Sequence, residues 1–235
     1  MSDTSTTTVQ TIFAPSATTH VEVERRVQRP QTIRLGDLPI TVVDRAEAAR
    51  RMVESALARR GSGLPPQYLT SANGQVLVEC DRDPETRRLF LEADAIHADG
   101  MPMVFASWYT ASVPLPERVA TTDLVHDVMK LSGKAGLRSF LLGATAEVNA
   151  AAVANLRTLH PDVPEIGGCD GYFSLDEEEA VCEAVNAFAP DVLWLGLGVP
   201  KEQAFVVRNR HRLTRVGVIK TSGGLFDFLS GKRAR

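Results

Sequence analysis

The sequence predicts an α/β fold, a Rossmann-like parallel sheet with helices on both faces in a single domain. Short apolar runs such as SFLLG (139–143) and DVLWLGLG (191–198) alternate with amphipathic segments of helical length, which is typical of successive βαβ units. The chain has 235 residues, 44% apolar and 23% charged, as expected for an ordinary globular protein. No apolar run approaches the ~20 residues that span a bilayer.

The N-terminal half predicts a hairpin followed by helices and strands in turn. Residues 1–32 are rich in Ser and Thr and have neither the basic nor the apolar region of a secretory signal, so we expect a flexible tail. The main domain is predicted over 33–235. Its first elements are a hairpin over 33–43, a helix over 46–60 capped by Asp44, a strand ending near Ser71, a helix entered through Asn73, and a short apolar pair at 95–96.

The Asp81-Arg82-Asp83 tripeptide resembles the Asp-x-Asp manganese signature of many nucleotide-sugar transferases. Asp83 is followed by Pro84, Glu85 and an apolar-periodic run. This order is that of an N-cap, a proline at the first helical position and an acid in the first turn. We therefore predict a helix cap at Asp83 and no metal site.

The C-terminal half alternates regularly between strands and helices. Its predicted strands are 139–143, 165–168, 191–198 and 217–224, and its predicted helices are 146–160 capped by Thr145, 176–189 and 200–213, with a short closing segment at 225–231. In parallel sheets of this kind, ligands bind beyond the carboxyl ends of the strands. The chemistry is therefore expected just after Ser71, Leu142, Leu197 and Thr221.

Charge, cysteines and histidines argue against a nucleic-acid-binding protein, a disulfide or metal framework, and a hydrolase with a catalytic triad. The net charge of −3 does not favour nucleic acid as a partner. Three cysteines at irregular spacing form neither a disulfide framework nor a metal pattern, which suits a reducing cytoplasm. The five histidines are scattered and there is no Gly-x-Ser-x-Gly, so no Ser-His-Asp or Cys-His arrangement is predicted.

Loops of small residues follow several predicted strands, with Gly143, Gly196 and Gly198 as the candidate binding positions. Small residues let the backbone approach a phosphate, and a helix N-terminus supplies free N–H groups. Equally, glycine simply makes tight turns between strand and helix. No loop completes a dinucleotide or P-loop fingerprint, because Lys201 stands where a dinucleotide site requires glycine.

Asp99, in Ala98-Asp99-Gly100, is the candidate general base. A carboxylate at a strand end can accept the proton of an acceptor hydroxyl. The competing interpretation is an Asp-Gly turn that caps itself. Arg118 could neutralise a phosphate, or lie on the surface. Tyr172 could stack on a base, or pack on the sheet edge. Glu202 and Gln203 open a helix, where first-turn capping is the alternative.

Eight fragments in order carry a family resemblance: Ser71-x-Asn73, Ala98-Asp99-Gly100, Glu117-Arg118-Val119, FLLG, GCDGYF, GLGVPKEQ, GGLFDF and SGKRAR. Together they resemble the WecG/TagA/CpsF glycosyltransferases, glycosyltransferase family 26, from about residue 34 to the end. The resemblance implies an inverting, metal-independent transferase without a cofactor, which uses a UDP-sugar. Its acceptor would be a lipid-diphosphate-linked saccharide in surface polysaccharide synthesis.

The resemblance also implies roles for individual residues. Asp99 matches the proposed base, and Arg118 matches an arginine near the donor phosphates. Ser71, which stands where the family has threonine, and Asn73 belong to the donor pocket. The nucleoside site is matched by Tyr172 and Asp227.

Three departures from the family pattern are present. Glu202 and Gln203 reverse the usual Gln-Glu order, which leaves the donor sugar open. The run ERVAT stands where the family tends to have glycine near Thr121. The chain ends at Arg235, where members continue into a basic and aromatic appendage that touches the membrane, so we expect that segment to be missing here.

Full-length protein is expected in the cytoplasm at the inner face of the membrane, and a homo-oligomer is left open. The alternative function is a non-catalytic module that binds UDP or another nucleotide. A dehydrogenase is less favoured because the dinucleotide fingerprint is incomplete.

Overall fold

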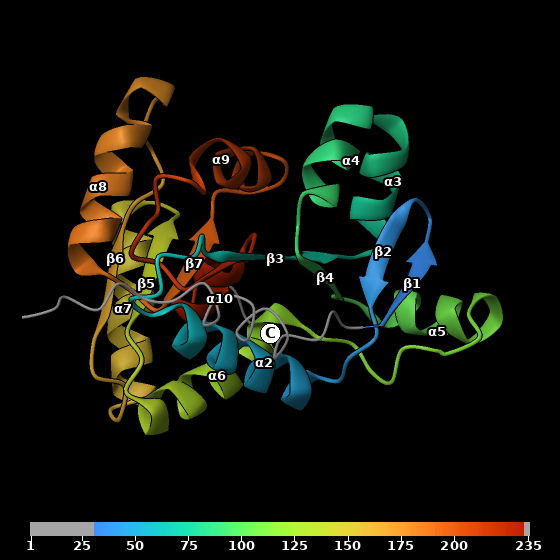
Figure 1. The fold of residues 1–235 in the computed structure, drawn as a ribbon, viewed down its shortest axis with the longest axis horizontal. Coiled ribbons are helices and arrows are strands. Elements are labelled where there is room, and N and C mark those ends of the chain that lie inside the picture. Colours follow the sequence, from blue (N-terminus) through green and yellow to red (C-terminus); the bar gives the residue numbers. More distant parts are fainter. Residues whose placement is uncertain (1–30, 233–235) are drawn as a thin grey trace, which may run out of the picture.

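A central sheet of eight strands organises the described part of the chain, residues 31–232 of this computed structural model (Figure 1). Its strand order is β1-β2-β4-β3-β8-β7-β5-β6. β1 and β2 pair antiparallel, and all the other neighbouring strands run parallel. The predicted Rossmann-like α/β fold is therefore confirmed. The strands are β1 (Thr32–Leu35), β2 (Leu38–Thr41), β3 (Gln67–Ala72), β4 (Ala95–Ala98), β5 (Ser139–Gly143), β6 (Ile166–Cys169), β7 (Val192–Gly196) and β8 (Val218–Thr221).

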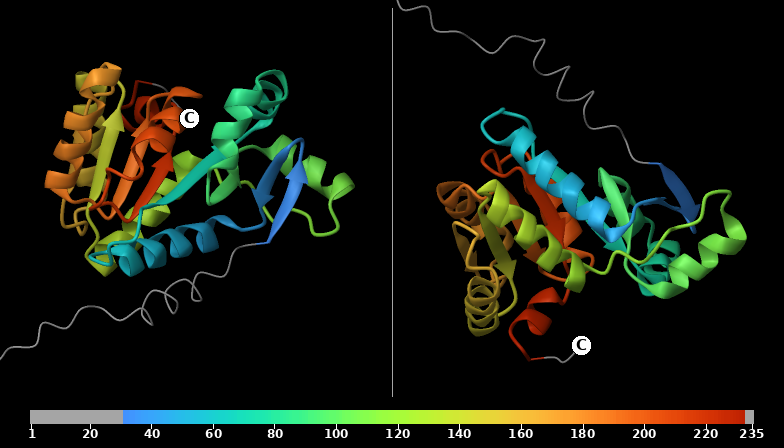
Figure 2. Two further views of the ribbon diagram at one scale, coloured as in Figure 1. Left: turned by 45° about the horizontal axis from the view of Figure 1, so that its top comes forward. Right: turned by 90° about the horizontal axis from the view of Figure 1, so that it is seen from below.

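Helices cover both faces of the sheet, as Figures 1 and 2 show. One face is packed by α2 (Arg45–Arg59), α6 (Thr121–Ala135), α7 (Ala146–Leu159) and α10 (Leu225–Leu229). The opposite side carries α3 (Gly74–Arg82), α4 (Pro84–Leu91), α8 (Glu178–Phe188) and α9 (Lys201–Asn209), and a short 3₁₀ turn, η1 (Leu175–Glu177), precedes α8. α5 (Met101–Thr110) extends from the sheet beside β1.

Burial of both faces explains why β7, a central strand, is apolar throughout. In β7, Trp194 packs in the cluster with α2 and α6, whereas Leu193 and Leu195 pack with α8 and α9. Successive side chains of a strand point to opposite faces. Since both faces are covered here, apolar side chains are favoured at every position of β7.

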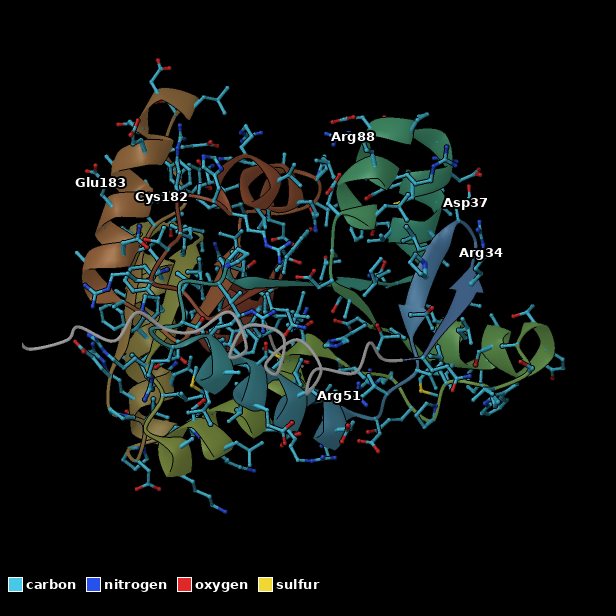
Figure 3. All side chains as sticks on the ribbon, viewed as in Figure 1. Arg34, Asp37, Arg51, Arg88, Cys182 and Glu183 are labelled. Carbon is cyan, nitrogen blue, oxygen red and sulfur yellow. The ribbon has the colours of Figure 1, made fainter. Side chains whose placement is uncertain are left out.

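The β1–β2 hairpin extends the sheet and is confirmed as predicted. Its apolar side chains form a separate core cluster with α3, α4 and α5. Asp37, in the hairpin turn, pairs with Arg34 of β1 and with Arg87 of α4. Figure 3 shows Arg34 and Asp37 at the outer end of the hairpin beside α3 and α4. These exposed pairs tie the hairpin to α4, at a modest gain in stability.

Most predicted helix starts are confirmed by their capping bonds. The side chain of Asp44 accepts from Glu47 N at 2.7 Å, and that of Asn73 accepts from Val76 N at 3.0 Å. Thr145 caps α7 through Val148 N at 3.3 Å. Each bond joins residues three positions apart, so the local sequence was sufficient to predict it.

The sequence interpretation predicted neither α5 nor α6. Glycine at 100 and alanine at 120 stand at their N-cap positions, and neither provides a side-chain cap. Residues 101–116 contain no charged residue, so α5 lacks the polar face by which the period of an amphipathic helix is recognised in a sequence. The predicted tail over 1–32 lies outside the described residues except for its last two, and β1 begins at Thr32. Within the described chain, no helix has the length and apolar character needed to cross a membrane.

Candidate functional site

The parallel strands β3, β4, β5, β7 and β8 end at one edge of the sheet. Strand register aligns Ala72 with Ala98, and Gly143 with Gly196. Leu195 of β7 pairs with Thr221 of β8. The predicted site residues that follow these strands therefore gather along one edge, where α/β sheets bind their ligands.

Asp99 lies directly after β4, and its carboxylate is held by the start of α6. Its backbone N–H donates to Ala72 O at 2.8 Å. Oδ2 accepts from Thr121 N at 3.1 Å and from Thr121 Oγ1 at 3.0 Å. The carboxylate thus caps a distant helix rather than its own Asp-Gly turn. Within the described chain, no hydrogen bond engages Oδ1.

Ser71 connects this carboxylate to a buried lysine of β8. Its Oγ lies 3.3 Å from Thr121 Oγ1 and accepts from Lys220 Nζ at 2.8 Å. Nζ also donates to the carbonyl oxygen of Thr221 at 2.8 Å. Sequence reasoning did not single out Thr121 or Lys220 as site residues. For Lys220 a signal was present: it is the one charged residue in the otherwise apolar run GVIKT.

Asn73 and Arg118 flank the same strand ends. A Cβ built on Gly100 would lie 3.7 Å from Cβ of Asn73, so the loops after β3 and β4 are adjacent. Val119 N donates to Ala98 O at 2.7 Å and brings the neighbouring Arg118 beside the end of β4. The Arg118 side chain is 51% exposed, and its guanidinium lies 3.7 Å from an Asp123 oxygen. It is therefore accessible to a ligand.

The glycines of the β5 and β7 loops have structural reasons to be glycine. A Cβ on Gly143 would lie 2.2 Å from Gly196 O, and Ala144 N donates to that same oxygen at 3.2 Å. Gly198 has φ +81°, a left-handed conformation that favours glycine. Close packing and turn geometry therefore account for these positions without a phosphate, and their role in binding stays a prediction.

The free N–H groups expected around these glycines are taken up by Glu202. Its carboxylate accepts from Leu197 N and Gly198 N, both at 3.2 Å, and from Gly223 N at 3.1 Å. Burial raises the pKa of Glu202 to about 7, against the opposing effects of Gly223 N–H and Lys220. An acid of the protein itself therefore occupies three N–H groups of the loops after β7 and β8, where the sequence left phosphate binding and tight turns as alternatives.

A match to a known family extends over the whole predicted main domain. The chain matches the family described as Glycosyl transferase WecG/TagA/CpsF family over residues 33–235. It belongs to this family. As a WecG/TagA/CpsF glycosyltransferase, it acts in cell-surface polysaccharide synthesis. The match begins one residue after the start of β1 and includes every strand end described above.

Gln203 is fully buried between α9 and the sheet of this WecG/TagA/CpsF member. Its Nε2 donates to Thr70 Oγ1 at 3.3 Å, and no hydrogen bond to Oε1 is found within the described chain. Thr70 Oγ1 lies 2.7 Å from Thr221 Oγ1. Gln203 thus links α9 to β3 and, through Thr70, to β8, and its contact with substrate stays a prediction.

The remaining predicted residues of this glycosyltransferase, Tyr172 and Asp227, come after β6 and β8. Tyr172 follows β6, the strand at the edge, and is 77% exposed. Asp227 lies in α10, on the α2 and α6 side. Exposure leaves Tyr172 free to contact a nucleotide. The structure does not test the assignment of either residue to the nucleoside.

Asp83 caps α4, as predicted. Its carboxylate accepts from Glu85 N at 3.1 Å, Thr86 N at 3.2 Å and Thr86 Oγ1 at 2.6 Å. These bonds hold the pKa of Asp83 below its ordinary value, Thr86 Oγ1 contributing most. Over residues 31–232, no group of three or more His, Cys, Asp or Glu side chains is arranged to hold a metal ion.

Proposed function

We propose that this WecG/TagA/CpsF glycosyltransferase transfers a sugar from a UDP-sugar to an acceptor hydroxyl in a single inverting displacement, with Asp99 as general base. The observation that carries the proposal is the state of the Asp99 carboxylate. Thr121 holds Oδ2 through two hydrogen bonds, and Oδ1 has no partner in the described chain. An oriented carboxylate with one unoccupied oxygen suits proton transfer from an acceptor hydroxyl.

In this mechanism the acceptor oxygen attacks the anomeric carbon as its proton passes to Oδ1. The bond from the anomeric carbon to the diphosphate oxygen breaks, and UDP leaves from the opposite face with inversion. Arg118 is assigned to the growing charge on UDP because its guanidinium lies half-exposed beside the end of β4. A metal-independent reaction is supported by Asp83, whose carboxylate is engaged in capping α4.

The acceptor is proposed to be a lipid-diphosphate-linked saccharide, reached at the membrane surface. Family membership in surface polysaccharide synthesis supports this class. Ser71 and Asn73 are assigned to the donor pocket because they end β3, next to Asp99 at the same edge of the sheet.

Asp99→Asn tests the proposal, in an assay of UDP release with the full chain and a panel of UDP-sugars. The variant's amide oxygen can still accept from Thr121, so the fold should be retained while basicity is lost. We expect turnover to fall roughly 10²–10⁴-fold, the usual contribution of a general base, with UDP affinity little changed.

Asp37→Asn is the matched control. It removes a carboxylate from the hairpin turn that precedes β2, at the opposite edge of the sheet, and should leave turnover unchanged. Turnover of Asp99→Asn within a few-fold of wild type would refute the role of Asp99. UDP binding without transfer of any sugar would favour a non-catalytic nucleotide-binding module instead.

A further inference from the structure

Lys220 is a lysine of β8 with no exposed surface. An ammonium group withdrawn from water is destabilising unless hydrogen bonds and opposite charges compensate for it. Here Nζ donates to Ser71 Oγ and to Thr221 O, each at 2.8 Å. A buried charge at the carboxyl edge of the sheet, two hydrogen bonds away from Thr121 Oγ1, points to a role in the site.

The chemistry of the groups sets the direction of the hydrogen bonds that start at Lys220. An ammonium only donates, and a carboxylate only accepts. Ser71 Oγ accepts from Lys220, which leaves its own hydrogen for Thr121 Oγ1 at 3.3 Å. Thr121 Oγ1 in turn donates to Oδ2 of Asp99 at 3.0 Å. The hydrogen bonds therefore all point in one direction, with each group donating to the next from Lys220 to Asp99.

Three ionisable groups interact electrostatically with the ammonium of Lys220. Burial lowers the pKa of Lys220 to about 8, while the carboxylates of Asp99, after β4, and Glu202, of α9, oppose that effect. His97 of β4 is neutral, because burial and the charge of Lys220 lower its pKa to about 3. Glu202 already accepts three backbone N–H groups, whereas Asp99 is joined to Lys220 through the two hydroxyls.

We propose that Lys220 is a positioning residue for the transfer reaction: its ammonium orients the Ser71 and Thr121 hydroxyls, so that Oδ2 of Asp99 is held as an acceptor and Oδ1 is left for the substrate hydroxyl. This inference rests on the proposed role of Asp99 as base. Once Lys220 loses its proton, the amine can accept a hydrogen bond as well as donate one. The amine then no longer fixes the direction of these hydrogen bonds, and the Asp99 carboxylate is held less firmly in one orientation.

Carbon-13 NMR of the lysine side chains tests the link between Lys220 and Asp99 without any assay of activity. The chain contains only five lysines, so protein labelled at lysine Cε gives five signals, and Lys220→Met identifies the one from Lys220. We expect this signal to titrate near pH 8. In Asp99→Asn it should titrate at lower pH, since one opposing carboxylate is lost. An unchanged midpoint in Asp99→Asn overturns the coupling, and Asp37→Asn is the control that should leave it unchanged.

Kinetics then tests the positioning role. Lys220→Met, similar in length but uncharged, should lower kcat about 10–100-fold, the scale of a misplaced catalytic group, with donor KM within about twofold. We expect wild type to lose rate above about pH 8, and Lys220→Met should remove this loss. Thr121→Val removes the hydroxyl between Ser71 and Asp99 and leaves Lys220 unchanged, so it should lower kcat similarly. The kcat of the variant that carries both changes should be no lower than that of the slower single variant, because both changes break the same series of hydrogen bonds.

A kcat for folded Lys220→Met within twofold of wild type overturns the proposal. If that variant does not melt cooperatively, the kcat of Thr121→Val decides instead. If wild type transfers no sugar from any donor, the proposed function fails, and the NMR titration still decides whether Lys220 and Asp99 are coupled.

Discussion

Glu202 connects the charge distribution of the site to a measurable pH dependence of stability. Glu202 is 2% exposed, and burial raises the pKa of its carboxyl group from 4.5 to about 7. Glu202→Gln removes the titration while keeping an oxygen that can accept from Leu197 N, Gly198 N and Gly223 N. The difference between the two proteins therefore isolates the ionisation of this one side chain.

The expected magnitude follows from proton linkage. A pKa higher in the folded state means that the folded protein binds the proton more tightly than the unfolded chain. The stabilisation is therefore fully present below pH 4.5 and is lost as the pH rises through about 7. At about 1.4 kcal/mol per pH unit, wild type should lose up to roughly 3 kcal/mol relative to Glu202→Gln over this range.

Urea unfolding of both proteins at several pH values between 4.5 and 7 measures this difference. Other acids and histidines titrate in both proteins and largely cancel. The window stays below pH 7 because loss of Glu202 also lowers the pKa of Lys220, which titrates near 8 in wild type. A difference in unfolding free energy that stays constant with pH, or that grows in the opposite direction, would refute the reasoning from burial.

Two further predictions concern metal and nucleotide. Asp83→Ala should lower Tm by roughly 2–4 °C through loss of the α4 cap while turnover persists, and EDTA should not affect transfer; manganese dependence abolished by changing Asp81 or Asp83 would contradict this. UDP should raise Tm more than ADP or GDP at equal concentration because Tyr172 and Asp227 are assigned to uridine, and equal shifts for all three nucleotides would remove that assignment.

The family could be predicted from eight short motifs in a fixed order. Many elements could be predicted because their signals depend on neighbouring residues. Asp44, Asn73 and Thr145 cap their helices through bonds that join positions three apart. Asp83 caps α4 in the same way, so its predicted cap is confirmed. The helices α5 and α6, whose N-caps are Gly100 and Ala120, lack this local signal and were not predicted.

The sequence by itself determined the alternation of strands and helices, the edge of the sheet at which the predicted site residues lie, and Asp99 as the proposed acid. Only the tertiary structure decided what surrounds that acid. Thr121 is 22 residues from Asp99, and Lys220 is 149 from Ser71, so no local rule relates them. The physical reason is that a parallel sheet brings strand ends together irrespective of their distance along the chain. Groups buried at these strand ends must find partners inside the protein, as the ammonium of Lys220 and the carboxylate of Glu202 do.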